Sequence, residues 1–171
     1  MNKKKMDKMM FVYLGISLII VILFLTLPII YVDTDQSFYA NGFRILAGTY
    51  RKVPSESNPK VIETITILKT SSFNFCAILF PIGSFLFYKT VSNKPMKRLS
   101  AFLCAVVGFI YILFIPIMAN SWRNLMYLKM DISRAWGWIV VSLIYLAYLI
   151  FIIIDLIITL KKEKKELPVQ G

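Results

Sequence analysis

Four long runs of apolar residues, separated by shorter polar segments, make up most of this chain. The runs cover about residues 10–30, 72–88, 99–119 and 136–160. At a rise of about 1.5 Å per residue, helices of these lengths can cross a hydrocarbon layer of about 30 Å. The pattern therefore predicts an all-α membrane protein, with four transmembrane helices in one bundle and a single membrane domain over residues 1–171.

The polar segment at residues 33–71 is the largest part of the chain outside the predicted helices. Its second half, VIETITILKT from Val61 to Thr70, is dense in β-branched residues, which favours a strand. The stretch GFRILAGTY at residues 42–50 is the expected partner strand, and a polar turn with two prolines lies between them. We predict a small extracytoplasmic β-hairpin-like loop between the first and second helices. An interfacial helix over residues 37–47 is the alternative.

Composition agrees with insertion into a membrane. The chain is 58% hydrophobic and has a mean hydropathy of +0.69, whereas soluble domains are nearer half apolar. A water-soluble core built from such runs would need about as much polar chain to cover it. The polar segments are too short for that, so the runs are expected to face lipid.

Positive charge gathers at three places in a chain whose net charge is +11. Twelve of the twenty Lys and Arg residues lie beside the ends of apolar runs: Lys3, Lys4, Lys5 and Lys8; Lys89, Lys94, Lys97 and Arg98; Lys161, Lys162, Lys164 and Lys165. Because short loops rich in Lys and Arg stay in the cytoplasm, both termini are predicted to be cytoplasmic. No basic stripe interleaves with aromatic residues, so we expect no nucleic-acid partner.

Several features are typical of a multi-pass protein of the bacterial plasma membrane. The chain is rich in Lys, Ile and Phe, and its outer segments contain neither paired cysteines nor a glycosylation sequon.

The predicted layout has four helices, both ends inside and a larger first outer loop with strand character. This layout resembles that of claudin-like tetraspan proteins over the whole chain, and the resemblance implies the architecture alone.

The sequence lacks the residue patterns of an active site or a cofactor site. It contains no histidine, the commonest general base and the commonest metal ligand. Its two cysteines, Cys76 and Cys104, lie inside predicted helices, and the chain has neither zinc-ligand spacing nor a glycine-rich phosphate loop. We therefore expect no catalytic, cofactor-binding or metal-binding residues, and no enzymatic activity.

Asp155 is the one acidic residue well inside a predicted span, and an ionisable residue at this depth is a functional candidate. Lys162 follows it by seven residues on the same helical face, so a snorkelling lysine can pair with it. We expect a structural ion pair or interfacial solvation. A role in a proton or cation path is the alternative.

Small residues line one face of the third predicted helix. Ser100, Cys104 and Gly108 follow one another at intervals of four residues, which places them on one side. Small side chains at this spacing let a neighbouring backbone approach closely. We expect this face to pack within the bundle, and a homo-oligomer contact through it is the alternative.

The leading hypothesis for function is a non-catalytic membrane protein that binds a membrane-protein partner or an extracytoplasmic ligand through the first outer loop. An accessory subunit of a transporter and an immunity protein against a membrane-active toxin are two forms of it. The candidate contact residues are Phe43, Arg44, Ile45, Tyr50, Ile65 and Ile67. The alternative hypothesis is a small oligomeric transporter or channel subunit that uses Asp155.

Overall fold

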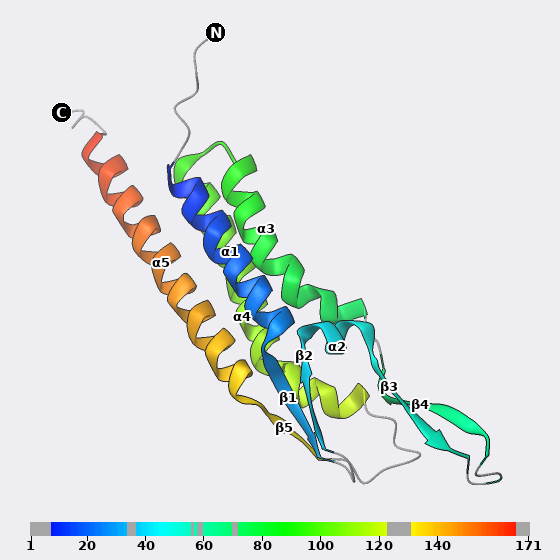
Figure 1. The fold of residues 1–171 in the computed structure, drawn as a ribbon. Coiled ribbons are helices and arrows are strands. Elements are labelled where there is room, and N and C mark those ends of the chain that lie inside the picture. Colours follow the sequence, from blue (N-terminus) through cyan, green and yellow to red (C-terminus); the bar gives the residue numbers. More distant parts are fainter. Residues whose placement is uncertain are drawn as a thin grey trace.

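The computed structural model describes residues 8–33, 37–55, 57, 60–69, 72–122 and 131–166. The described chain is mostly helical, with short strands gathered at one end (Figure 1). In chain order its elements are α1 (Lys8–Thr26), β1 (Pro28–Asp33), β2 (Phe38–Asn41), α2 (Gly42–Ala47), β3 (Thr49–Pro54), β4 (Ile62–Leu68), the 3-10 turn η1 (Ser72–Phe75), α3 (Cys76–Thr90), α4 (Lys94–Trp122), β5 (Asp131–Arg134) and α5 (Trp136–Glu166).

Within the described part of the chain, four helical segments are long and apolar enough to cross a membrane. They are Lys8–Thr26, Phe73–Thr90, Lys94–Ala119 and Trp136–Lys164. The four helices lie side by side, and both α1 and α4 contact α3 and α5 (Figure 1). Large apolar side chains are exposed along their outer faces, whereas soluble monomers rarely expose so much contiguous apolar surface. These faces suit a lipid environment.

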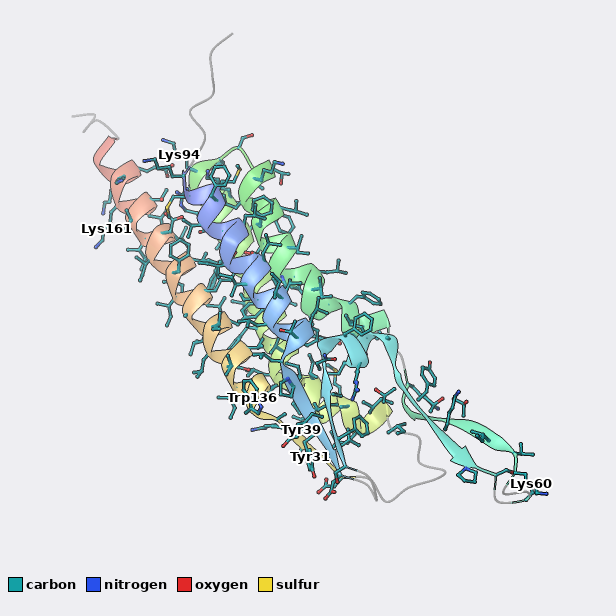
Figure 2. All side chains as sticks on the ribbon, in the orientation of Figure 1. Tyr31, Tyr39, Lys60, Lys94, Trp136 and Lys161 are labelled. Carbon is teal, nitrogen blue, oxygen red and sulfur yellow. The ribbon has the colours of Figure 1, made fainter. Side chains whose placement is uncertain are left out.

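The two ends of the helices carry different residues. At one end α1 begins, α5 ends and α3 connects to α4, and Lys94 and Lys161 lie there (Figure 2). At the other end lie α2 and the described strands, with Tyr31, Lys60 and Trp136 (Figure 2). We call these the basic end and the outer end.

Helix boundaries differ from the predicted ones at both ends. The first run, predicted to be helical to residue 30, leaves the helix after Thr26 and continues as β1 from Pro28. Proline lacks a backbone N–H and disfavours the helical conformation of the residue before it. At the basic end, α4 begins at Lys94 rather than near residue 99, and α5 continues to Glu166. Lysine is a good helix former, so these helices extend beyond their apolar parts.

A three-stranded antiparallel sheet, in the order β2-β1-β5, lies at the outer end. Tyr31 of β1 is opposite Tyr39 of β2 on one side and Ser133 of β5 on the other. Because β1 directly follows α1 and β5 directly precedes α5, the sheet joins the first and last helices. The sequence pattern does not predict this sheet, since β1 continues an apolar run and β5 has only 4 residues.

The predicted outer hairpin is present, but its first strand is different. The expected strand at residues 61–70 contains β4, which pairs with β3 in antiparallel register from Thr49–Leu68 to Pro54–Ile62. The prediction that residues 42–50 form the partner strand is wrong for most of that stretch, because Gly42–Ala47 form α2.

The short helix α2 forms where a local side chain caps its first turn. The Asn41 side chain caps its first turn and accepts a hydrogen bond from the Arg44 backbone N–H at 3.0 Å. The alternative of a helix over residues 37–47 is therefore correct for its second part, while Phe38–Asn41 form β2.

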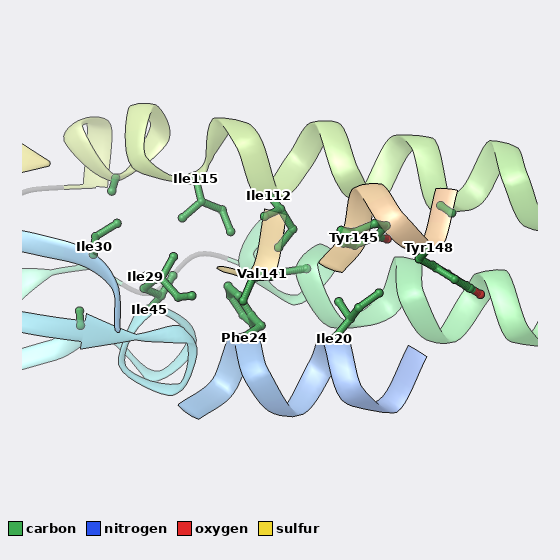
Figure 3. Packing of buried hydrophobic residues seen from close by; sticks show 14 of the residues in the cluster. Ile20, Phe24, Ile29, Ile30, Ile45, Ile112, Ile115, Val141, Tyr145 and Tyr148 are labelled. Atoms are coloured by element: carbon green, nitrogen blue, oxygen red, sulfur yellow. The ribbon is translucent and has the colours of Figure 1, made fainter. Parts of the chain in front are cut away.

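One hydrophobic core runs from the helices into the outer end (Figure 3). Phe24 of α1 and Ile115 of α4 belong to the same buried cluster as Ile30 of β1 and Ile45 of α2. A Cβ atom at Gly42 would collide with the Phe24 carbonyl, so the start of α2 approaches α1 as only glycine permits. The sheet and α2 are thus anchored on the helix ends.

Candidate functional site

The predicted contact residues of the outer loop do not all share one surface. Ile45 is only 2% exposed and belongs to the core, whereas Phe43 on the same short helix is 64% exposed. Ile65 lies in β4 opposite Arg51, and its side chain is outside the described part of the structure. Ile45 is therefore a packing residue, while Phe43 is free to meet a partner.

Arg44, Tyr50 and Ile67 come together around a surface pocket of about 490 Å³. The Arg44 guanidinium lies 5.9 Å from the centroid of the Phe38 ring and donates a hydrogen bond to the Tyr39 carbonyl at 3.1 Å. A guanidinium carries five N–H donors, so others remain for an acceptor from outside. The pocket thus presents one cation beside aromatic and aliphatic side chains.

Asn74 fixes α2 against the long helices. It is fully buried, and its side-chain amide donates to the Ile45 carbonyl at 2.9 Å. Its amide oxygen accepts a hydrogen bond from the Tyr111 hydroxyl at 3.2 Å. Because a buried amide needs partners for both its groups, this contact holds α2, η1 and α4 in one arrangement.

At the basic end, the buried Asp155 pairs with Arg98 and not with Lys162. Its Oδ2 accepts hydrogen bonds from Arg98 Nε at 2.7 Å and from the Tyr13 hydroxyl at 3.1 Å. Arg98 also donates to the Lys94 carbonyl at 3.0 Å, while the Lys162 side chain is exposed. The start of α4 and the end of α5 lie at the same end of the molecule (Figure 1). Arg98 and Asp155 can therefore meet, because they lie at a similar level along their helices.

Further contacts connect this pair to the other long helices. The Tyr13 ring of α1 stacks on Tyr88 of α3, with centroids 4.0 Å apart. The Tyr148 hydroxyl of α5 lies 3.0 Å from Ser84 Oγ and 3.3 Å from Ser17 Oγ. Polar groups at membrane depth commonly stabilise helix association in this way. The network therefore joins α1, α3, α4 and α5.

The network does not continue along the core to the outer end. The next buried hydroxyl on α5, that of Tyr145, has no hydrogen-bond partner among the described residues. The contacts between Asn74, Tyr111 and Ile45 form a separate group. A relay of protons across the described core would need a connection between the two groups.

The small-residue face of α4 packs within the chain. The Cys104 thiol donates to the Phe80 carbonyl at 3.5 Å. A Cβ atom at Gly108 would collide with the Tyr145 hydroxyl and with Phe80 Cβ. Cys104 and Gly108 therefore allow α3 and α5 to approach α4, and Ser100 is partly buried on the same helix.

Among the described residues, no group of three or more His, Cys, Asp or Glu side chains is placed to hold a metal ion. No protein-family model, curated protein or solved structure matches this chain. Function is therefore inferred from the two ends of the molecule and their geometry.

Proposed function

We propose that this chain is a non-catalytic integral membrane protein that binds a partner protein through its outer end. The charge pattern predicts that this end is extracytoplasmic. The partner would contact the β3–β4 hairpin and the pocket around Arg44. An accessory subunit and an immunity-type protein both fit this mode of action.

The main support for this proposal is the β3–β4 hairpin. It is anchored at its base, where Ile67 and Leu68 are buried, and beyond the base its strands pack mainly against each other. In Figure 1 it extends past the helix ends and away from the three-stranded sheet. A two-stranded hairpin without a covering layer is marginally stable in water. A partner protein would supply that layer.

The exposed residues support a protein partner. Tyr50 is 57% exposed and Ile62 is 67% exposed, and Phe43 projects from α2 nearby in the chain. Tyr and Arg are enriched among the residues that dominate binding energy at interfaces. Arg44 has donors suited to a carboxylate, with which arginine forms strong paired hydrogen bonds. We therefore expect an acidic side chain of the partner to enter the Arg44 pocket.

Photo-crosslinking in native membranes tests this proposal. A benzoylphenylalanine probe replaces Tyr50 or Ile62, and the control probe replaces Leu143, which is exposed on the lipid-facing side of α5. We expect one discrete heavier adduct from both outer probes and not from the control probe. The same adduct from all three positions, or none from the outer positions, would contradict an outer binding surface. An adduct of twice the chain mass would favour a homo-oligomer.

The same crosslinking experiment also tests the role of the Arg44 pocket. Arg44→Ala removes the proposed carboxylate contact, and loss of such a residue commonly weakens binding by about 2 kcal/mol, or about thirty-fold. The adduct from the Tyr50 probe should therefore fall sharply. Lys69→Ala removes an exposed charge beyond the end of β4 and should leave the adduct unchanged. Equal losses in both variants would mean that the outer surface contributes only a diffuse charge.

A further inference from the structure

A second pocket, of about 450 Å³, lies at the basic end and plays no part in the proposed partner binding. Its lining comes from α1, α4 and α5, and it includes Lys94, Arg98 and Lys162. Arg98 is neutralised by Asp155, which also lines the pocket. The remaining charged lining residues are Lys94, Lys162 and one carboxylate, Glu163, so positive charge is in excess.

The position of Lys94 adds to the attraction for an anion. It stands at the first residue of α4, which has 29 residues. The N-terminus of a helix carries a partial positive charge and favours negative groups. Two lysines from different helices therefore line one pocket, and one of them stands at this helix start.

An apolar wall continues from the pocket along α5. Ile158 lines the pocket, and Ile154 lies one turn away on the same helix. Both side chains are about half exposed, at 46% and 51%, on a helix long and apolar enough to cross a membrane. Lysines follow this apolar stretch directly, which is the level at which lipid headgroups lie. The pocket thus combines the cationic side chains of its lining with a surface suited to acyl chains.

We propose that this pocket binds an anionic phospholipid. The headgroup phosphate would lie between Lys94 and Lys162, and an acyl chain would follow Ile158 and Ile154. Basic pockets between transmembrane helices on the cytoplasmic side are suited to anionic headgroups. The lysines would attract any phosphate, and the apolar wall favours a lipid over a free phosphate ion.

Native mass spectrometry of the full chain in detergent tests this proposal with phosphatidylglycerol and phosphatidylcholine of identical acyl chains. The parent protein should retain phosphatidylglycerol in preference to phosphatidylcholine. Lys94→Gln with Lys162→Gln should weaken phosphatidylglycerol binding about twenty-five-fold, since each basic residue near an anionic lipid contributes about a five-fold factor. Glu163→Gln should strengthen it, because a negative charge leaves the pocket lining.

A matched control has the same change in net charge at the same end. Lys89→Gln with Lys164→Gln removes two exposed lysines that do not line the pocket, and binding should stay close to that of the parent protein. Equal weakening in both double variants would overturn the proposal in favour of diffuse electrostatics. Lack of preference between the two lipids would also overturn it. Displacement of the lipid by millimolar inorganic phosphate would show a site for the free ion.

Folding of the variants is checked by circular dichroism. If the double variant does not fold, Lys162→Gln alone replaces it, because that side chain is exposed near the end of α5. The single variant should weaken phosphatidylglycerol binding about five-fold. Binding equal to that of the parent protein would contradict the proposed role of Lys162.

Discussion

Arg98 and Asp155 show how single residues stabilise this molecule. Each keeps only about a tenth of its side chain exposed, at 11% and 9%. The attraction between two such charges offsets the cost of removing them from water only when both are present. The Tyr13 hydroxyl provides the carboxylate with a further donor. At this scale the pairing of Asp155 with Arg98 joins α5 to α4.

Asp155→Asn should destabilise the protein, because it leaves the Arg98 charge buried without a counter-ion. We expect the free energy of unfolding to fall by about 3 kcal/mol, and Arg98→Gln to have a similar effect. Thermal unfolding in detergent, followed by circular dichroism, measures both. The double variant Arg98→Met with Asp155→Leu should recover most of the loss.

The double variant also separates the structural role of the ion pair from a further role of Asp155. If the losses of the single variants simply add, the two side chains do not stabilise each other and the ion-pair interpretation is wrong. If the double variant folds but no longer forms the outer adduct, Asp155 has a role beyond holding the helices together.

At the scale of elements, the outer end has two parts that differ in how they pack against the long helices. The β2-β1-β5 sheet and α2 share the core of the long helices through Ile30 and Ile45. Among the described apolar side chains of the β3–β4 hairpin, the buried ones are Ile67 and Leu68, at its base. The first part is therefore packed into the core of the long helices, and the second is the element that we propose for partner binding.

Gly137→Ala should weaken the junction between the sheet and α5. A Cβ atom at Gly137 would collide with the Pro28 carbonyl and lie 2.8 Å from Leu27 Cβ. Overpacking of this kind costs about 1–3 kcal/mol, so the melting temperature in detergent should fall. Gly15→Ala in α1 is the control, because a Cβ there meets nothing within 4 Å. A fall of equal size in both variants would show that the close approach at Gly137 has no special importance.

At the scale of the whole molecule, charge and apolar surface define an axis. Four apolar helices separate an end rich in lysine from an end that carries the strands (Figure 2). Positive charge near the ends of spans sets the orientation of membrane proteins. The same asymmetry predicts that the two proposed sites lie on opposite sides of the membrane, with the proposed protein binding at the outer end and the proposed lipid binding at the basic end.

Cysteine labelling of intact cells tests this orientation. In a chain with Cys76 and Cys104 changed to Ala, Lys60→Cys should react with a membrane-impermeant maleimide. Lys161→Cys should react only after the membrane is permeabilised, because the positive-inside rule predicts that this residue is cytoplasmic. The reverse pattern would place the hairpin in the cytoplasm and remove the basis for an extracytoplasmic partner.

Several features follow from the sequence alone, because their physical causes are local. Apolar run length predicts the four helices, and the β-branched stretch around Ile65 predicts β4. Position in the chain also identifies Asp155 as a residue that needs a partner.

Tertiary structure decided which distant segments meet. β1 is the central strand of its sheet because β2, nearby in the chain, and β5, about a hundred residues later, both pair with it, and no local pattern indicates the pairing with β5. Asp155 meets Arg98, 57 residues away, although Lys162 is nearer in sequence. Ile45 faces the core because Asn74 binds its carbonyl. A hydrogen bond or ion pair between distant residues forms only when helix packing brings both groups to the same level along the helix axes. That level depends on how the helices pack, and local sequence patterns do not determine it.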